Sequence, residues 1–198
     1  FVSMNTNLTP KSVLGFCDRI DPARVVLIYA SLHIKELERL GLTETFIRHF
    51  HLFKTKGFRI LARGVAYPPL LKEIEKYKEF FRKEGIELKF GRYDGEYEGR
   101  EYPAAYTQEE LQAFGLENAP DLRSCQRGTL CNAGYNAAVV WPDGAVVLCL
   151  NVIEKLGHIY EGIRFKERMI RCPSPYCTCP AHFYDTGLYE KALRENKV

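Results

Sequence analysis

The chain has 198 residues, of which 46% are apolar and 27% are charged, and its formal net charge is +3. This is an average globular composition, with enough residues for one ordinary domain or two small ones. We find neither the basic cluster of a nucleic-acid binder nor an apolar run near the roughly 18 residues of a membrane span. The first residues also lack the basic start and apolar middle of a signal peptide.

Residues 1–105 alternate between strand-like and helix-like patterns. Residues 24–31 contain a continuous apolar run rich in strand formers, which is typical of a strand covered on both faces. Apolar side chains recur at helical spacing over residues 43–56, and again from Pro68 to about Lys83. The remaining strands are predicted over residues 1–4, 58–65 and 86–90.

This alternation predicts a parallel sheet with right-handed crossovers. A closed eight-stranded barrel needs about 250 residues, so about four strands make at most half of one. Because an open sheet edge favours aggregation, we expect a missing N-terminal half as a partner of this chain. The expected fold class is α/β: half of a parallel β/α barrel, followed by a small α+β cysteine-rich domain with a β-hairpin.

A polar, glycine-containing linker is predicted over residues 91–106. Thr107 with Glu110 three residues later predicts a capping box that opens a short helix to Phe114. We therefore place the domain boundary near residue 105, which gives domains over residues 1–105 and 106–198.

Cysteine is concentrated in the last third of the chain. The first 120 residues contain only Cys17, which we expect to be a buried structural thiol. Disulfides are disfavoured because the number of cysteines is odd and nothing indicates secretion. Bound metal in a cytoplasmic protein explains the cluster better. Its six members are Cys125, Cys131, Cys149, Cys172, Cys177 and Cys179.

Two of these cysteines flank a predicted hairpin. Residues 137–141 and 145–150 read as strands, and the Pro-Asp-Gly sequence at 142–144 has the chemistry of a tight turn. The hairpin should bring Cys131 and Cys149 toward each other. A basic, helix-like stretch then runs to residue 171, and three prolines make the segment over residues 172–180 a stiff loop.

The spacing of the cysteines bears on the identity of the metal. Structural zinc sites favour two short Cys-x2-Cys knuckles, and this chain has none. Spacing alone therefore favours an iron–sulfur cluster modestly and leaves zinc open.

Cys131, twelve residues, Gly144, four residues and Cys149 together resemble the C-x(9–15)-G-x4-C signature of the SPASM/twitch domain. That domain is the auxiliary-cluster module of radical SAM enzymes. Cys125 fits the fuller pattern, and Leu-Gly-His-Ile at 156–159 resembles its Leu-Gly-Asn segment. The closing group is shortened here to Cys172, Cys177 and Cys179.

The resemblance implies one auxiliary [4Fe-4S] cluster rather than the two of a full SPASM domain, because six thiolates cannot ligate two. Cys131 and Cys149 are its firmest ligands, and Cys125 and members of the closing group Cys172, Cys177 and Cys179 supply the rest. A second, incompletely ligated cluster helped by His182 is the alternative. We expect Trp141 to shield the cluster, and His158 to be a hydrogen-bonded or surface histidine.

In that family the ends of two successive strands line the pocket for S-adenosylmethionine. By position, Ser31, His33 and Arg63 could reach its ribose or carboxylate, although ordinary polar residues at strand ends fit equally well. The resemblance implies hydrogen abstraction by a 5′-deoxyadenosyl radical from a peptide or protein substrate, with the auxiliary cluster binding substrate or accepting an electron.

The C-x3-C-x2-C motif of the cluster that cleaves S-adenosylmethionine is absent from this sequence. We therefore expect the chain alone to be inactive, and no catalytic residue is assigned. The rival hypothesis is a non-catalytic zinc-binding or interaction module.

Overall fold

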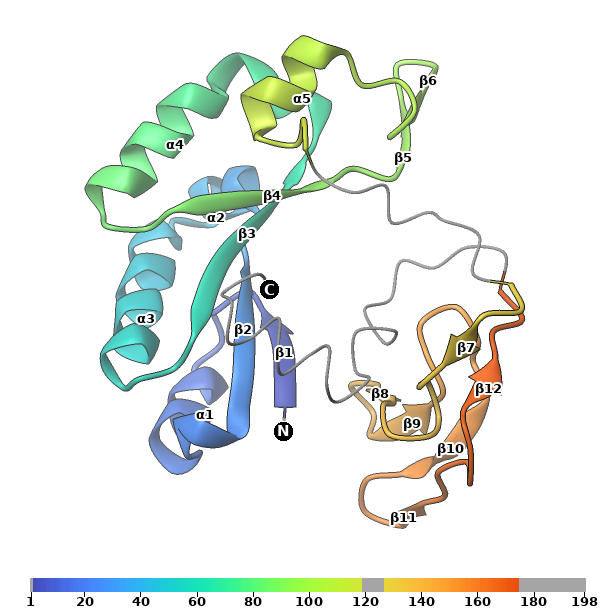
Figure 1. The fold of residues 1–198 in the computed structure, drawn as a ribbon. Coiled ribbons are helices and arrows are strands. Elements are labelled where there is room, and N and C mark those ends of the chain that lie inside the picture. Colours follow the sequence, from blue (N-terminus) through green and yellow to red (C-terminus); the bar gives the residue numbers. More distant parts are fainter. Residues whose placement is uncertain (1, 119–126, 175–198) are drawn as a thin grey trace. The chain divides into compact units, whose positions relative to one another are not determined.

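The computed structural model describes residues 2–118 and 127–174 (Figure 1). The chain divides into two compact units, Phe1–Ala119 and Pro120–Val198. In the described residues no helix combines the length and apolarity needed to cross a membrane.

The first unit is built on a parallel sheet of four strands. Its spatial order is β1 (Val2–Thr6), β2 (Val25–Ser31), β3 (Ile60–Ala66) and β4 (Leu88–Arg92). Every neighbouring pair is parallel, so the predicted α/β architecture is confirmed. The buried run Val25–Ile28 in β2 explains its continuous apolar sequence, since this strand lies inside the sheet.

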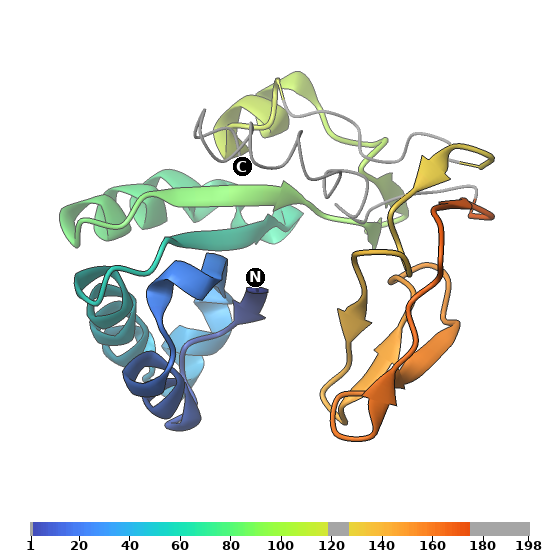
Figure 2. The same cartoon turned by 60° about the horizontal axis from the view of Figure 1, so that its bottom comes forward.

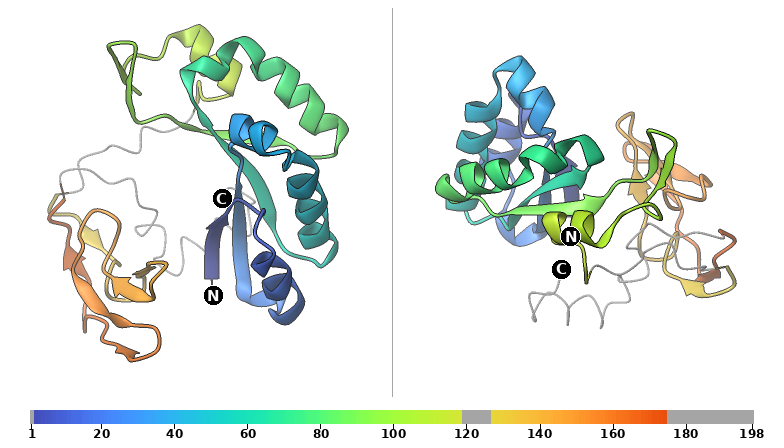
Figure 3. Two further views of the ribbon diagram at one scale, coloured as in Figure 1. Left: turned by 180° about the vertical axis from the view of Figure 1, so that it is seen from behind. Right: turned by 90° about the horizontal axis from the view of Figure 1, so that it is seen from above.

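Four helices lie on one face of this sheet, as Figures 1 and 3 show. They are α1 (Ser12–Arg19), α2 (Ile34–Leu40), α3 (Thr43–Thr55) and α4 (Ile74–Lys83), the last entered through a 3-10 turn over Pro68–Glu73. A short 3-10 turn, Pro22–Arg24, precedes β2. The apolar faces of the helices meet the sheet in one core, in which Phe46, Phe53 and Phe81 are fully buried.

The strands β3 and β4 begin two residues later than the sequence predicts. Phe58 and Ile86 are buried, but each closes the preceding helix rather than opening a strand. The amide of Phe58 donates to the carbonyl of Phe53, and glycine at 57 adopts φ +90°. This is a Schellman motif, in which an apolar residue commonly follows the glycine. Helix α4 ends in the same way, because the amide of Ile86 donates to the carbonyl of Phe81.

The stretch predicted as a polar linker instead contains a hairpin. Strands β5 (Gly95–Tyr97) and β6 (Arg100–Tyr102) pair antiparallel across Glu98 and Gly99, whose φ values of 49° and 70° are those of a type I′ turn. The prediction failed because the alternation of charge and tyrosine in these strands has no apolar core face.

Helix α5 (Gln108–Phe114) begins with the predicted capping box between Thr107 and Glu110. Its Phe114, followed by Leu116, is buried in the core of the first unit, and the Phe114 ring lies 5.3 Å from that of Phe90. Because α5 packs there, the compact units divide between residues 119 and 120 and not near residue 105.

The second unit is made of short strands, drawn in yellow to red in Figure 2. An antiparallel sheet has the order β11 (Gly162–Ile163), β10 (Lys155–His158), β9 (Ala145–Val147), β8 (Val139–Val140). A separate ladder pairs β7 (Leu130–Cys131) with β12 (Ile170–Arg171). The β8–β9 hairpin is confirmed. The expected basic helix before residue 171 is wrong, and residues 127–174 contain no helix.

Candidate metal centre and cofactor site

The turn between β8 and β9 depends on Gly144. The amide of Gly144 donates to the carbonyl of Trp141 at 2.9 Å, and Trp141 donates to Ala145 at 2.8 Å. Gly144 has φ +89°, and a Cβ there would lie 2.6 Å from Nε2 of His158. The glycine in the cysteine–glycine–cysteine spacing is therefore required by backbone conformation and by space.

His158 is a structural histidine, as predicted. Its Nε2 donates to the carbonyl of Asp143 at 2.9 Å, and its Nδ1 accepts the amide of Tyr160 at 3.3 Å. With both ring nitrogens engaged, the imidazole joins the β8–β9 turn to the segment after β10. This use leaves no nitrogen for a metal.

The structure brings Cys131 and Cys149 into one small apolar cluster. Cys149 is buried and Cys131 half-buried, and both pack with Ala133 and Leu148. Each sulfur accepts a backbone amide: Ala133 donates to Sγ of Cys131 at 3.4 Å, and Val152 donates to Sγ of Cys149 at 3.2 Å. Amide donors of this kind fix the position of a sulfur atom that ligates a metal.

Cys172 directly follows β12, the strand that pairs with β7, which contains Cys131. Cys131 is the register partner of Ile170, and the amide of Cys172 donates to the carbonyl of Thr129 at 2.9 Å. The Cys172 side chain is buried. The other predicted ligands lie outside the described residues: Cys125, Cys177 and Cys179, with the alternative ligand His182.

Within residues 2–118 and 127–174, no three His, Cys, Asp or Glu side chains form a group that could hold a metal ion. The described part of the second unit thus brings Cys131 and Cys149 to one apolar cluster and puts Cys172 directly after the strand that pairs with β7. The N–H···S bonds of Cys131 and Cys149 and their apolar surroundings fit thiolate ligation of a cluster. The complete ligand set remains a prediction.

In the first unit, Ser31 and Arg63 are register partners on β2 and β3. Ser31 is the last residue of β2, whereas Arg63 is in the middle of β3 (Ile60–Ala66). Ligands of open parallel sheets bind at the carboxyl ends of the strands, where Ser31 lies. His33 follows β2 after Leu32, is exposed, and precedes α2. Ser31 and His33 are therefore at the carboxyl end of β2, and Arg63 is opposite Ser31 on the neighbouring strand.

Two further residues fix the position of Arg63. Its guanidinium lies 5.5 Å from the ring centre of Tyr29, a cation–π distance. A Cβ on Gly91 would lie 2.9 Å from Nη2 of Arg63, so glycine leaves room for that side chain. Sequence analysis missed both, although the two-residue period of a strand already puts Tyr29 on the same face as Ser31.

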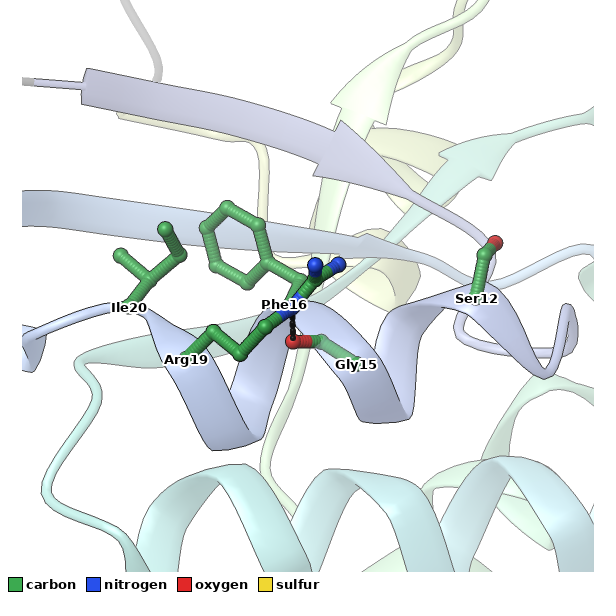
Figure 4. A pocket seen from close by; sticks show the side chains of 5 residues that line it. All are labelled: Ser12, Gly15, Phe16, Arg19 and Ile20. Carbon is green, nitrogen blue, oxygen red and sulfur yellow. Dashed lines mark hydrogen bonds between the residues drawn. The ribbon is translucent and has the colours of Figure 1, made fainter.

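Two other features of the first unit carry no ligand chemistry. Cys17 is buried in α1, as predicted, and burial raises the pKa of its thiol. A hollow of about 370 Å³ lies beside the same helix, lined by Ser12, Gly15, Phe16, Arg19 and Ile20 (Figure 4). Arg19 is the only charged residue that lines it, and its Nε already donates to the carbonyl of Gly15 at 3.0 Å.

No protein-family model matches the chain, and neither does any curated protein. Solved structures similar to it include native anSMEcpe with bound AdoMet and Kp18Cys peptide, at a TM-score of 0.47 and 18% identity over 95% of this chain and 58% of that chain. Native anSMEcpe with bound AdoMet gives a TM-score of 0.47 and 17% identity over 95% of this chain and 57% of that one. The chain therefore spans less than two thirds of the length of these structures.

Proposed function

We propose that this chain is the C-terminal part of a radical SAM enzyme whose second unit binds one auxiliary [4Fe-4S] cluster. The observation that carries the proposal is the pair Cys131 and Cys149. Both sulfurs accept backbone amides within a shared apolar cluster, and they flank a turn whose glycine cannot be replaced without strain. The same three positions define the spacing that resembles the SPASM/twitch signature.

In this proposal Cys131 and Cys149 ligate iron, and the remaining thiolates come from among Cys125, Cys172, Cys177 and Cys179. The amides of Ala133 and Val152 orient the two sulfurs, and Leu148 excludes water from one side. When bound, the cluster supplies a one-electron acceptor or an open iron site for substrate.

The first unit is proposed to hold S-adenosylmethionine. Arg63 is a fixed cation, held over Tyr29 beside Gly91, and suits the carboxylate of that ligand. Ser31 and His33 can donate to a carboxylate or accept from a ribose hydroxyl at the same sheet edge.

The activity itself is proposed for the complete protein. There the partner of this chain is an N-terminal half with the C-x3-C-x2-C motif, and the substrate is a peptide or protein side chain. The alternative is a zinc-binding interaction module, because N–H···S bonds suit zinc thiolates equally well.

The test is anaerobic reconstitution of the full 198-residue chain with iron and sulfide. We expect about four irons per chain and visible absorption from sulfur-to-iron charge transfer. Cys131→Ala and Cys149→Ala should each abolish or severely reduce iron binding, because each removes a ligand.

The matched control is Cys17→Ala, which removes a buried thiol from the other unit and should leave iron content unchanged. A colourless protein with stoichiometric zinc would establish the alternative. Equal iron loss in all three variants would show that the ligand assignment is wrong.

A further inference from the structure

An ion pair joins the segments that follow β2 and β3 in the first unit. Lys35 is the second residue of α2, and Glu73 is the last residue of the 3-10 turn that leads into α4. The Lys35 ammonium contacts the Glu73 carboxylate directly. Both segments begin where parallel strands end, which is the edge of such a sheet where ligands bind. The ion pair therefore connects two parts of this edge that are 38 residues apart in the chain.

Tyr77 of α4 connects the same two segments a second time. Its hydroxyl accepts a hydrogen bond from Nζ of Lys35 at 2.8 Å and donates one to Oε2 of Glu38 at 2.9 Å. The Lys35 ammonium also lies 5.1 Å from the centre of the Tyr77 ring, a cation–π distance, and Tyr77 is 3% exposed. We call Lys35, Glu38, Glu73 and Tyr77 the Lys35 network.

The network is more than an exposed ion pair, which by itself contributes little to stability. Lys35 and Glu38 both bond to the hydroxyl of a buried ring, so one fixed group holds them in place. The hydrogen bond between Lys35 and Glu73 raises the pKa of Lys35 and lowers the pKa of Glu73, so both stay charged at neutral pH. In the described part of the chain the Glu73 side chain caps no amide of α4, and its carboxylate is committed to Lys35 instead.

The segment after β2 contains two of the candidate cofactor residues. Ser31 and His33 precede Lys35 by four and two residues. Between them, the amide of Leu32 donates to the carbonyl of Arg63 on β3 at 2.8 Å. The segment is thus attached to β3 through its backbone and to the start of α4 through the Lys35 side chain.

We propose that the Lys35 network holds the segments after β2 and β3 together as one rigid binding edge, with Lys35 as the positioning residue for Ser31 and His33. An edge that is ordered in advance loses less freedom when a ligand binds, which raises its affinity. That the ligand is S-adenosylmethionine rests on the proposed function, whereas the connection between the two segments does not.

The experiment compares the full 198-residue chain with its variant Lys35→Met, which removes the charge and keeps an unbranched side chain. The amides of Leu37 and Leu70 report on the two segments, because they donate to the carbonyls of His33 and Tyr67, both at 2.9 Å. We expect hydrogen exchange of both amides, followed by NMR, to become about two- to tenfold faster in the variant. Calorimetry should show an affinity for S-adenosylmethionine that is about two- to tenfold lower, because the variant must order this edge on binding.

Three further variants separate the network from a general loss of stability. Lys35→Arg keeps the cation and should retain most of the wild-type affinity. Tyr77→Phe keeps the buried ring but removes the shared hydroxyl, and should change exchange and affinity in the same direction as Lys35→Met. The matched control is Arg39→Met, which breaks an ion pair with Glu36 inside α2 alone and should change neither quantity.

Circular dichroism establishes that each variant is folded. Unchanged exchange of the two amides in Lys35→Met overturns the inference, and so do equal changes in Arg39→Met. Wild-type affinity for S-adenosylmethionine in Lys35→Met would refute this inference alone. A wild-type chain that binds no S-adenosylmethionine would refute the cofactor site of the proposed function, and the exchange of the two amides would still decide whether the network holds the two segments together.

Discussion

Tyr106→Phe isolates one hydroxyl that joins two strand ends of the first unit. The hydroxyl donates to Ala66 and accepts from Tyr93, whereas phenylalanine keeps the ring and its contact with Tyr102. A typical hydrogen bond contributes about 0.5–1.5 kcal/mol net, and both backbone partners are left unpaired in the variant. We therefore expect a loss of about 2 kcal/mol in the free energy of unfolding at neutral pH.

The same hydroxyl gives stability an alkaline limit. Burial is the main cause that raises the pKa of Tyr106 to about 12, whereas an unfolded tyrosine ionises near pH 10. Between these values the unfolded chain loses its proton first, so stability that is complete below pH ~10 falls as pH rises toward ~12. The largest possible loss in the free energy of unfolding is ~2.7 kcal/mol, at 1.36 kcal/mol for each unit of pKa difference. We expect a loss of ~1 kcal/mol, because the ring is only half-buried.

Urea denaturation can separate the two units. All helices of the described residues lie in the first unit, so far-UV circular dichroism follows that unit. The single tryptophan, Trp141, lies in the second unit and reports on it by fluorescence. Tyr106→Phe should move the dichroism transition to lower urea concentration and reduce the loss of stability at alkaline pH. The fluorescence transition should stay unchanged. Tyr160→Phe, at an 85% exposed ring, is the control. Wild-type stability and an unchanged alkaline slope in Tyr106→Phe would refute the reasoning.

Two further substitutions test other parts of the fold. Gly144→Ala puts a side chain at positive φ and against His158. It should lower the free energy of unfolding of the second unit, measured by fluorescence, by about 2–3 kcal/mol. Gly162→Ala, at positive φ but with open space around the new side chain, should lower the same free energy by only ~1 kcal/mol. Equal losses in the two variants would show that the clash with His158 is unimportant. Phe53→Leu should destabilise the first unit by about 1–2 kcal/mol in urea, since the side chain is fully buried. Phe80→Leu, at a 42% exposed position, should cost under ~0.5 kcal/mol, and a larger loss there would contradict the assigned core.

Sequence predicted the first unit well where the apolar pattern of an element matches its burial. The continuous apolar run of β2 is buried on both faces, and the buried side chains of α3 recur at the helical period. It failed for α1 and α2, which were not predicted and have eight and seven residues. It also failed for the β5–β6 hairpin, since tyrosine rings packed on one another leave no alternation of apolar and polar residues.

For the candidate site, sequence predicted that the hairpin brings Cys131 and Cys149 toward each other, and both belong to the apolar cluster around Ala133. The hairpin register alone does not explain this, because Val139 pairs with Val147 and Cys131 lies well before β8. Ser31 could be placed at a strand end, but its register partner Arg63, in the middle of β3, required the sheet. The cation–π contact of Arg63 with Tyr29 depends on a side-chain conformation, which spacing does not encode. The amides that point at the sulfurs depend likewise on loop conformation after each cysteine.

The two units differ in what can stabilise them. The core of the first unit joins residues from five helices and four strands, whereas the buried cluster around the thiols has three members among the residues that the structure describes, Ala133, Leu148 and Cys149. The other buried apolar side chains described in this unit are few: Val146, Val147, Leu156 and Cys172. Small domains with so little apolar burial usually need a metal or disulfides. A metal bound by Cys131, Cys149 and Cys172 would close loops within this unit, and its binding energy would add directly to folding. The thiols that form the candidate site are thus also part of the core, so ligand binding and the stability of this unit are coupled.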